Sequence, residues 1–332
     1  MRRALAIFVA VAAIAAGIAA LAIGDNGDEG SAGGRRAAAD RWLPLAGASL
    51  ERTEVAAARV GRFIYVVGGF EEQSGVTTPA VERYDIRTDS WRRMASMPVG
   101  LNHPTAVARR GRVYVHGGYR ARRSLSSASA ALFEFDPARN RWRRLPSAPT
   151  PRAAHAVAVI GERFYAAGGA NADGSLRSME IYDFGDRRWR RGPSFPGPPR
   201  DHTTGVASGG RFYVLAGREG ANNYTAAERY DPRRRRWERL PNMRRERGGI
   251  TSVRLADGRI VLFGGEDFGT GNTIREVELF NPRTRRWRRL PDMRTPRHGL
   301  GGAALGNRVY SILGGPQPGF HFSDAIEYLD VR

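Results

Sequence analysis

The chain has 332 residues, a formal net charge of +20 at pH 7 and no cysteine. The lack of cysteine excludes disulfide bonds and lipid attachment through an N-terminal cysteine. Arginine carries the whole positive charge because no lysine is present, and a bias toward GC-rich codons would enrich Arg, Ala and Gly together without selection for a ligand.

The N-terminal segment predicts export. Two arginines precede an apolar run at 4–23, and a Gly-, Asp- and Ser-rich stretch follows it. A signal-peptide core has about 7 to 15 apolar residues and a membrane-spanning helix about 20, so a cleaved signal and a retained anchor both stay open. We interpret 1–24 as a signal peptide or membrane-anchor helix and 25–40 as a flexible spacer. The domain 41–332 is then exported, either anchored through 4–23 and facing outside, or secreted or periplasmic.

Within 41–332, three sequence marks recur with a period near fifty residues. The first is a pair of small residues after a short β-rich run, at 68–69, 117–118, 168–169, 216–217, 264–265 and 314–315. The second is an acidic-x-aromatic-Asp step such as Glu82 to Asp85, and the third is a tryptophan, at 42, 91, 142, 189, 237 and 287. Repeats of about 20 to 50 residues indicate solenoids, propellers or arrays. Four short strands in each of six units predict an all-β, six-bladed β-propeller.

The order of the marks also predicts how the ring closes. The repeats begin with a tryptophan strand and end at Asp330 with no tryptophan after it. We therefore expect the strand around Trp42 to Leu45 to pair with the strand around Ile326 to Leu329 and to complete the last blade. Such a pairing leaves no open edge to which another chain could add.

The three marks resemble the Kelch repeat, whose blades carry a Gly-Gly after the second strand, a Tyr-Asp at the third and a Trp at the fourth. The resemblance covers 41–332, with local departures at Ala216, Phe133 and Asn281. It implies that the blade-joining segments and the loops after the second strands share one face, where Kelch proteins commonly receive an acidic peptide or a small ligand. Galactose oxidase, a copper enzyme of this kind, needs a cysteine for its cofactor, so that activity is excluded.

Arginines at equivalent positions are the first candidates for ligand binding on that face. They occupy blade-joining segments, sixteen or seventeen residues before the small-residue pair, at Arg52, Arg152, Arg200, Arg247 and Arg297. The second blade carries Leu101-Asn102 instead. A ring of guanidinium groups around the channel mouth would suit a carboxylate, because the planar fork can make two parallel hydrogen bonds. The alternative is that these arginines bond to neighbouring blades and hold the ring together.

Other side chains of the same face are weaker candidates. Aromatic loop residues suit recognition, and those we single out are Tyr119, Tyr224 and Phe268. Four histidines lie in or beside blade-joining segments, at different offsets within their repeats: His103, His155, His202 and His298. Because a metal site needs several convergent ligands, we predict no metal and no cofactor. The chain has no nucleophile elbow, phosphate loop or paired His-Glu motif, and we assign no catalytic residue.

These observations lead to two main hypotheses of function. The first is an exported, monomeric, non-catalytic module that presents its loop face to a protein or an anionic envelope ligand, with no specific nucleic-acid binding. The second is an acidic-sugar mutarotase or epimerase similar to the N-acetylneuraminate epimerases, in which the ring arginines hold the substrate carboxylate. Glu219, Glu246 or a histidine would then act as acid or base. A third hypothesis, an adhesin that uses a basic outer wall, predicts binding that collapses as salt rises.

Overall fold

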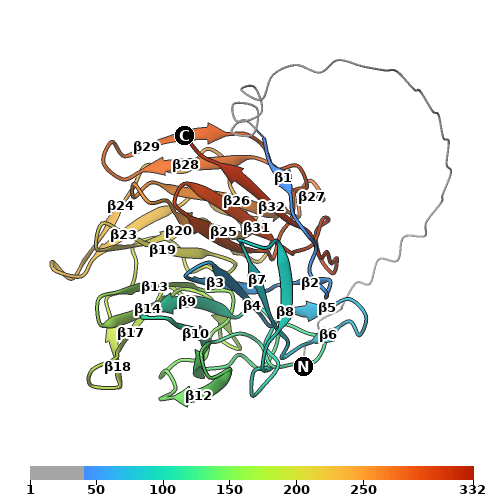
Figure 1. Cartoon of the computed structure of the whole chain (residues 1–332). Helices are drawn as coiled ribbons and strands as arrows, with labels where there is room; N and C mark the ends of the chain where they lie inside the picture. Colours follow the sequence, from blue (N-terminus) through green and yellow to red (C-terminus); the bar gives the residue numbers. More distant parts are fainter. Residues whose placement is uncertain (1–40) are drawn as a thin grey trace, which may run out of the picture.

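The structure, a computed structural model, describes residues 41–332, and every regular element there is a β-strand (Figure 1). The all-β prediction is confirmed for this part of the chain. The predicted signal or anchor and the spacer, 1–40, lie outside the described residues. Within 41–332, no helix is long and apolar enough to cross a membrane.

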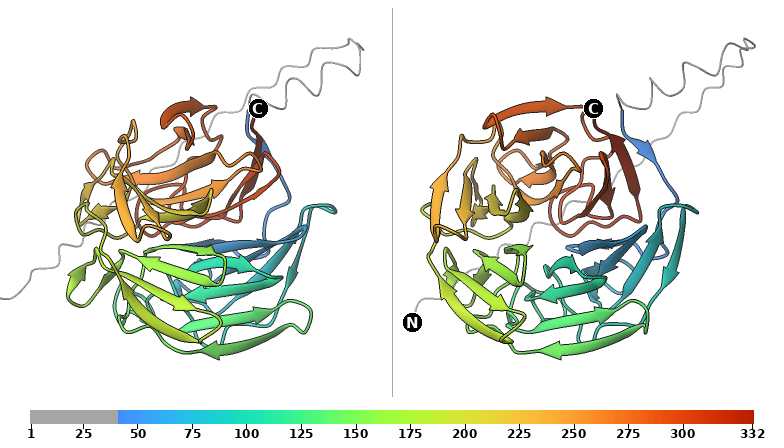
Figure 2. Two further views of the ribbon diagram at one scale, coloured as in Figure 1. Left: turned by 90° about the vertical axis from the view of Figure 1, so that its left-hand side faces the viewer. Right: turned by 60° about the vertical axis from the view of Figure 1, so that its left-hand side comes forward.

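Residues 41–332 form six main antiparallel sheets that stand in a ring (Figure 2). The first is β3 (Ala56–Val60), β4 (Phe63–Val67), β7 (Val81–Asp85) and β8 (Ser90–Arg93); the second is β9 (Thr105–Arg109), β10 (Arg112–His116), β11 (Leu132–Asp136) and β12 (Arg141–Leu145). The third is β13 (Ala156–Ile160), β14 (Arg163–Ala167), β17 (Met179–Asp183) and β18 (Arg188–Gly192); the fourth is β19 (Thr204–Ser208), β20 (Arg211–Leu215), β23 (Ala227–Asp231) and β24 (Arg236–Arg239). The fifth is β25 (Gly248–Arg254), β26 (Ile260–Asp267), β28 (Val277–Asn281) and β29 (Arg286–Leu290); the sixth is β30 (Gly301–Leu305), β31 (Arg308–Ile312), β32 (Ile326–Asp330) and β1 (Leu43–Pro44).

Short strands in the loops complete the sheet topology. They are β2 (Arg52–Thr53), β5 (Phe70–Glu71), β6 (Val76–Thr77), β15 (Ala170–Asn171), β16 (Gly174–Ser175), β21 (Arg218–Glu219), β22 (Asn222–Asn223) and β27 (Asn272–Thr273). Several of them pair a sheet-joining segment with the loop after a second strand, as β2 pairs β5 and as Asp201 bridges to Arg218. The two kinds of segment therefore lie on one face of the ring, which we call the loop face.

The first strand of each sheet faces the axis of the ring. Contacts between these inner strands run from β3 to β9, β13, β19, β25 and β30, and from β30 back to β3. Alanine and glycine are frequent in these strands, which lets the backbones converge. A Cβ atom on Gly205 in β19 would lie only 2.5 Å from the backbone nitrogen of Val157 in β13. The ring of antiparallel sheets is thus a propeller arrangement whose inner strands pack closely side by side around a central cavity of about 130 Å³.

The two ends of the described chain meet in one sheet, as predicted. β1 pairs antiparallel with β32, with Leu43 opposite Tyr328 and Pro44 opposite Glu327. Trp42 is 2% exposed, and its ring lies 5.6 Å from that of Phe263 between centroids. Pairing of the terminal strands therefore covers the outer edge of the sixth sheet.

The recurring tryptophans fasten each sheet to the segment before it. Each indole Nε1–H donates to a backbone carbonyl 43 to 47 positions earlier: Trp91 to Ala46, Trp142 to Ala95, Trp189 to Pro146, Trp237 to Pro193 and Trp287 to Pro241. Trp42 makes the equivalent bond, 3.0 Å long, to the carbonyl of Pro291 at the other end of the chain. The same contact thus operates across the point where the ring closes.

The small-residue pairs adopt a left-handed backbone, which explains their composition. At Gly68 φ is 64°, and a Cβ atom there would lie 2.3 Å from the carbonyl oxygen of Leu101. In the sixth sheet the pair with positive φ is Leu313 and Gly314, at 56° and 97°, rather than 314–315 as the sequence suggested. The extra glycine at Gly315 obscured this one-residue shift.

Candidate functional site

The five ring arginines lie inside the sheet packing. Each is 0% exposed, so no part of these guanidinium groups is open to a ligand at the channel mouth. Each pairs with a buried glutamate of a third strand: Arg52–Glu82, Arg152–Glu180, Arg200–Glu228, Arg247–Glu278 and Arg297–Glu327. The expectation of an exposed guanidinium ring is thereby corrected, and the alternative that the arginines hold the ring together accounts for the geometry.

Arg52 illustrates the shared arrangement. Its guanidinium donates to the carbonyl oxygens of Gly68 at 2.9 Å and Ala80 at 3.2 Å, and to Glu82 Oε2 at 2.9 Å. Burial lowers the pKa of Arg52, and the charge of Glu82 opposes that shift. The arginine therefore ties the joining segment to the left-handed pair and to the third strand.

A ring of backbone hydrogen bonds surrounds the centre of the loop face. Six equivalent positions, two residues after each ring arginine or after Leu101, all have positive φ: Glu54, His103, Ala154, His202, Gly249 and Gly299. Their carbonyls accept in turn from the N–H groups of His103, Ala154, Thr203, Gly249, Gly299 and Val55. The circuit returns to its start, so the backbone beneath the side chains at these positions is fixed.

Three of these positions carry ionisable side chains, and neighbouring segments add three more. His103 Nε2 lies 3.0 Å from Glu54 Oε2 and 3.1 Å from His202 Nε2. His298 Nδ1 lies 3.2 Å from Glu54 Oε1 and 3.5 Å from Glu266 Oε2. We call Glu54, His103, His202, Arg218, Glu266 and His298 the floor cluster.

Neighbouring charges outweigh burial in setting the pKa of Glu54 and of His298, whereas burial lowers the pKa of His202. Burial acts to raise the pKa of Glu54, yet His103 and His298 hold it well below its ordinary value. Burial acts to lower the pKa of His298, but the Glu54 carboxylate 3.2 Å away leaves that pKa raised. Arg218 donates to Glu266 Oε1 at 2.6 Å. The cluster thus contains coupled carboxylate and imidazole groups with little access to water.

Above the floor cluster opens a cavity of about 270 Å³ on the loop face. Its walls are apolar and come from separate loops: Phe70, Leu125, Phe268 and Phe320, with Arg123 beside them. The rings of Phe70 and Phe320 lie 4.8 Å apart between centroids, and the Arg218 guanidinium lies 4.5 Å from the centre of the Phe268 ring. We call this cavity the loop-face pocket.

Among the aromatic candidates, only Phe268 lines the loop-face pocket. Tyr119 is 5% exposed, and burial raises its pKa to about 12 while its ring packs edge-on against His103. The hydroxyl of Tyr224 donates to Glu219 Oε2 at 3.2 Å, away from the pocket lining. Tyr119 therefore supports the site from below, and Tyr224 lies outside it.

The sequence prediction missed most of the floor cluster. The sequence analysis does not single out Glu54, Arg218 or Glu266, and it sets the histidines aside as metal ligands because their offsets differ, keeping them only as a possible acid or base. His103 and His202 in fact share one offset, two residues after Leu101 and Arg200. That shared offset, together with Glu54 two residues after Arg52, was the signal available in the sequence.

Comparisons with known proteins give one consistent family. A model described as "KLHDC2/KLHL20/DRC7 Kelch-repeats domain" matches residues 54–250, and a Kelch motif matches 251–294. The chain is 35% identical over 133 residues to Kelch-like protein terF of Aspergillus terreus, covering 38% of this chain and 29% of that protein. It is 33% identical over 125 residues to alpha-scruin of Limulus polyphemus, covering 36% of this chain and 14% of that protein. The matches thus span less than a third of these relatives.

A solved structure titled "Structure of YjhT" is similar with a TM-score of 0.73 over 85% of this chain and 96% of that chain. Its sequence identity to this chain is 16%. At that identity the likeness supports the fold of the chain and carries no functional residue across.

Proposed function

Because this chain belongs to the Kelch-repeat family, we propose that it is a binding module that receives an apolar segment of a partner protein in the loop-face pocket. The observation that carries this proposal is the clustering of exposed apolar side chains at the pocket. Of the four large hydrophobic residues exposed in 41–332, three line this pocket: Leu125 at 51%, Phe268 at 44% and Phe320 at 48%. Clustered exposed apolar side chains around a concavity mark interaction sites.

The test is selection of peptides from a displayed random library on the full-length protein, followed by measurement of their dissociation constants. Selected peptides should share an aromatic or branched aliphatic residue. Phe268→Ala and Phe320→Ala should each weaken binding about tenfold or more, as for aromatic anchors at the centre of an interface. Leu305→Ala, which truncates the remaining exposed hydrophobic residue, at 39%, is the matched control and should leave binding unchanged. Selection of no peptide, or equal affinity in all three variants, would contradict the proposal.

A second candidate function is the acidic-sugar mutarotase. It is favoured by the position of Glu54 beside His103 and His298 under an open pocket, because ring opening needs an acid and a base at the substrate. The buried ring arginines offer no carboxylate contact, so Arg123 or Arg218, which both line the pocket, would have to supply one. Exchange between the anomers of free sialic acid, followed by NMR, should then be accelerated by the protein and lost in Glu54→Gln. If the wild-type protein does not accelerate the exchange, the mutarotase function is excluded and the binding module is the only candidate function that remains.

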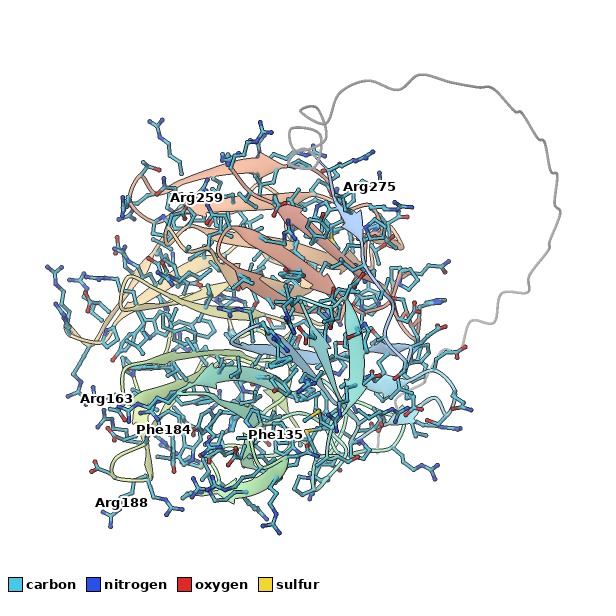
Figure 3. All side chains as sticks on the ribbon, in the orientation of Figure 1. Phe135, Arg163, Phe184, Arg188, Arg259 and Arg275 are labelled. Carbon is cyan, nitrogen blue, oxygen red and sulfur yellow. The ribbon has the colours of Figure 1, made fainter. Side chains whose placement is uncertain are left out.

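We also propose that the six sheets are six blades of one closed, monomeric propeller exported by 1–24. The backbone ring, the pairing of β1 with β32 and the apolar run at 4–23 support this. The outer strands carry exposed arginines, and Arg188 in β18 points away from the ring (Figure 3). A basic wall would assist approach to an anionic envelope surface. Fractionation of cells that make the full-length protein, with light scattering of the purified chain, tests location and oligomeric state.

A further inference from the structure

A chain of hydrogen bonds fixes the tautomer of His103. The Thr77 hydroxyl donates to the carbonyl of Ala121 at 2.6 Å, so its oxygen is free to accept from Asn102 Nδ2 at 2.7 Å. Asn102 thereby turns its Oδ1 toward His103 Nδ1, 2.8 Å away. His103 must donate from Nδ1, because an amide oxygen only accepts. In the neutral ring, Nε2 of His103 is then a bare lone pair.

The tautomer of His202 is fixed in the same way. Its Nδ1 lies 2.8 Å from Asp201 Oδ1, and a carboxylate also only accepts. Nε2 of His202 is therefore a second lone pair, and it faces Nε2 of His103 at 3.1 Å. Two lone pairs at this distance repel each other unless a proton or a metal cation is bound between or beside them.

The Glu54 carboxylate adds a third electron-rich atom. Its Oε2 lies 3.0 Å from His103 Nε2, and the ligand atoms of Glu54, His103 and His202 all lie within 4.8 Å of one another. Bonds of about 2.0 Å to a tetrahedral Zn²⁺ place neighbouring ligand atoms about 3.3 Å apart, close to the 3.0 Å between Glu54 and His103 and the 3.1 Å between His103 and His202. Donation from Nδ1 to an oxygen is also how metal-bound histidines are oriented by their outer partners. We propose that Glu54, His103 and His202 bind one divalent transition-metal ion of the zinc class.

The protein would supply only part of the coordination sphere of the ion. Three protein ligands leave a fourth position, and all three residues line the loop-face pocket, so that position would open toward it. On the other side of Glu54, His298 Nδ1 lies 3.2 Å from Glu54 Oε1 and 3.5 Å from Glu266 Oε2, so Oε2 of Glu54 is the oxygen that faces the two other ligands. An ion here would make the pocket floor favour a carboxylate or another anionic group beneath the apolar walls. The metal site does not depend on the peptide-binding proposal.

The test is a titration of the full-length protein, dialysed against chelator, with Co²⁺ and then Zn²⁺. We expect one equivalent of Co²⁺ to produce the intense visible bands of a four- or five-coordinate ion, Zn²⁺ to displace it, and the melting temperature to rise saturably with Zn²⁺. His103→Asn and His202→Asn should weaken Co²⁺ binding at least a hundredfold. Asparagine is chosen because it tolerates positive φ, as these positions require.

Controls separate loss of the site from loss of the fold. His321→Asn changes an exposed histidine of the same face and should bind Co²⁺ like the wild type. Asp201→Asn keeps all three ligands but removes the carboxylate partner of His202, and should weaken binding about ten- to a hundredfold. The near-ultraviolet circular dichroism of the tryptophans reports folding of each variant. The proposal is overturned if the wild-type protein gives no cobalt bands, or if folded His103→Asn and His202→Asn bind Co²⁺ as tightly as the wild type. The first outcome would mean that a shared proton holds the cluster together.

Discussion

Replacing Arg247 by methionine should destabilise the protein strongly while leaving the loop-face pocket intact. The Arg247 guanidinium donates to the carbonyl of Glu276 at 2.7 Å and to Glu278 Oε1 at 2.9 Å. Glu278 is 2% exposed and would keep only backbone donors, from Arg244 and Arg245. Removing one partner of a buried ion pair costs about 3 to 5 kcal/mol of unfolding free energy, because the other charge stays buried and unpaired.

The assay is chemical denaturation of Arg247→Met, Glu278→Leu and the double variant, with the free energy of unfolding taken from linear extrapolation. The double variant should recover part of the loss, because no unpaired charge remains, and the coupling energy should exceed about 1 kcal/mol. The carbonyl of Glu276 still lacks its donor from Arg247 in the double variant, so recovery should be incomplete.

An exposed pair gives the matched control. Arg143 in β12 donates to both carboxylate oxygens of Glu134 in β11, at 3.0 and 2.9 Å, but its side chain is 60% exposed. Arg143→Ala should cost only about 0 to 1 kcal/mol. If Arg247→Met unfolded at the same denaturant concentration as the wild type, the structural role of the ring arginines would be wrong, and a ligand-binding role would return.

Two further predictions concern pH and ring closure. Burial, with a smaller contribution from Arg152, lowers the pKa of His116 to about 3. The pKa of His116 is lower in the folded than in the unfolded protein, so protonation favours unfolding. The contribution of neutral His116 to the free energy of unfolding is therefore complete above about pH 6.5 and is lost as pH falls toward 3. At pH 5 the loss should be about 2 kcal/mol. Urea denaturation at pH 7 and pH 5 should show this loss in the wild type and a smaller loss in His116→Phe. Some loss should remain in the variant, because burial also lowers the pKa of His155. An equal loss in both proteins would exclude His116 as its source. Trp42→Ala should lower the free energy of unfolding by about 3 to 5 kcal/mol, which thermal melts will detect. It should also promote self-association through the exposed edge of β32, which size-exclusion chromatography will detect. A monomer with unchanged stability would contradict the role of β1 in closure.

The fold could be predicted because each repeat contains the residues that its own turns and sheet contacts require. Glycine is needed where φ is positive, and each tryptophan bonds to the segment before its own sheet. The arginine role could also have been predicted. The second repeat lacks the arginine at Leu101 and also lacks the glutamate at Phe133, as expected when the two charges exist only as a pair. A ligand-binding ring would have no reason to lose both together.

The floor cluster could not be predicted in the same way, because it depends on closure of the ring. Glu54, His103 and His202 come from three joining segments spread over about 150 positions of the chain. The three residues share one offset within their repeats, but Ala154, Gly249 and Gly299 occupy the same offset in the other repeats, so the offset alone does not mark a site. Only the circuit of backbone hydrogen bonds brings their side chains to one point.

The backbone at these positions bears on whether the cluster is there by chance. Non-glycine residues with positive φ cost about 1 to 3 kcal/mol each, and glycine occupies two of the six ring positions. Ala154 has φ of 52° without any polar group, so the strained backbone alone does not identify a site. His103 and His202 differ from Ala154 because neighbouring residues orient their side chains. The Nδ1 atom of each has an oxygen partner, from Asn102 and Asp201 respectively. Strain combined with fixed tautomers and an open pocket above is the combination expected of a ligand site rather than of ring packing.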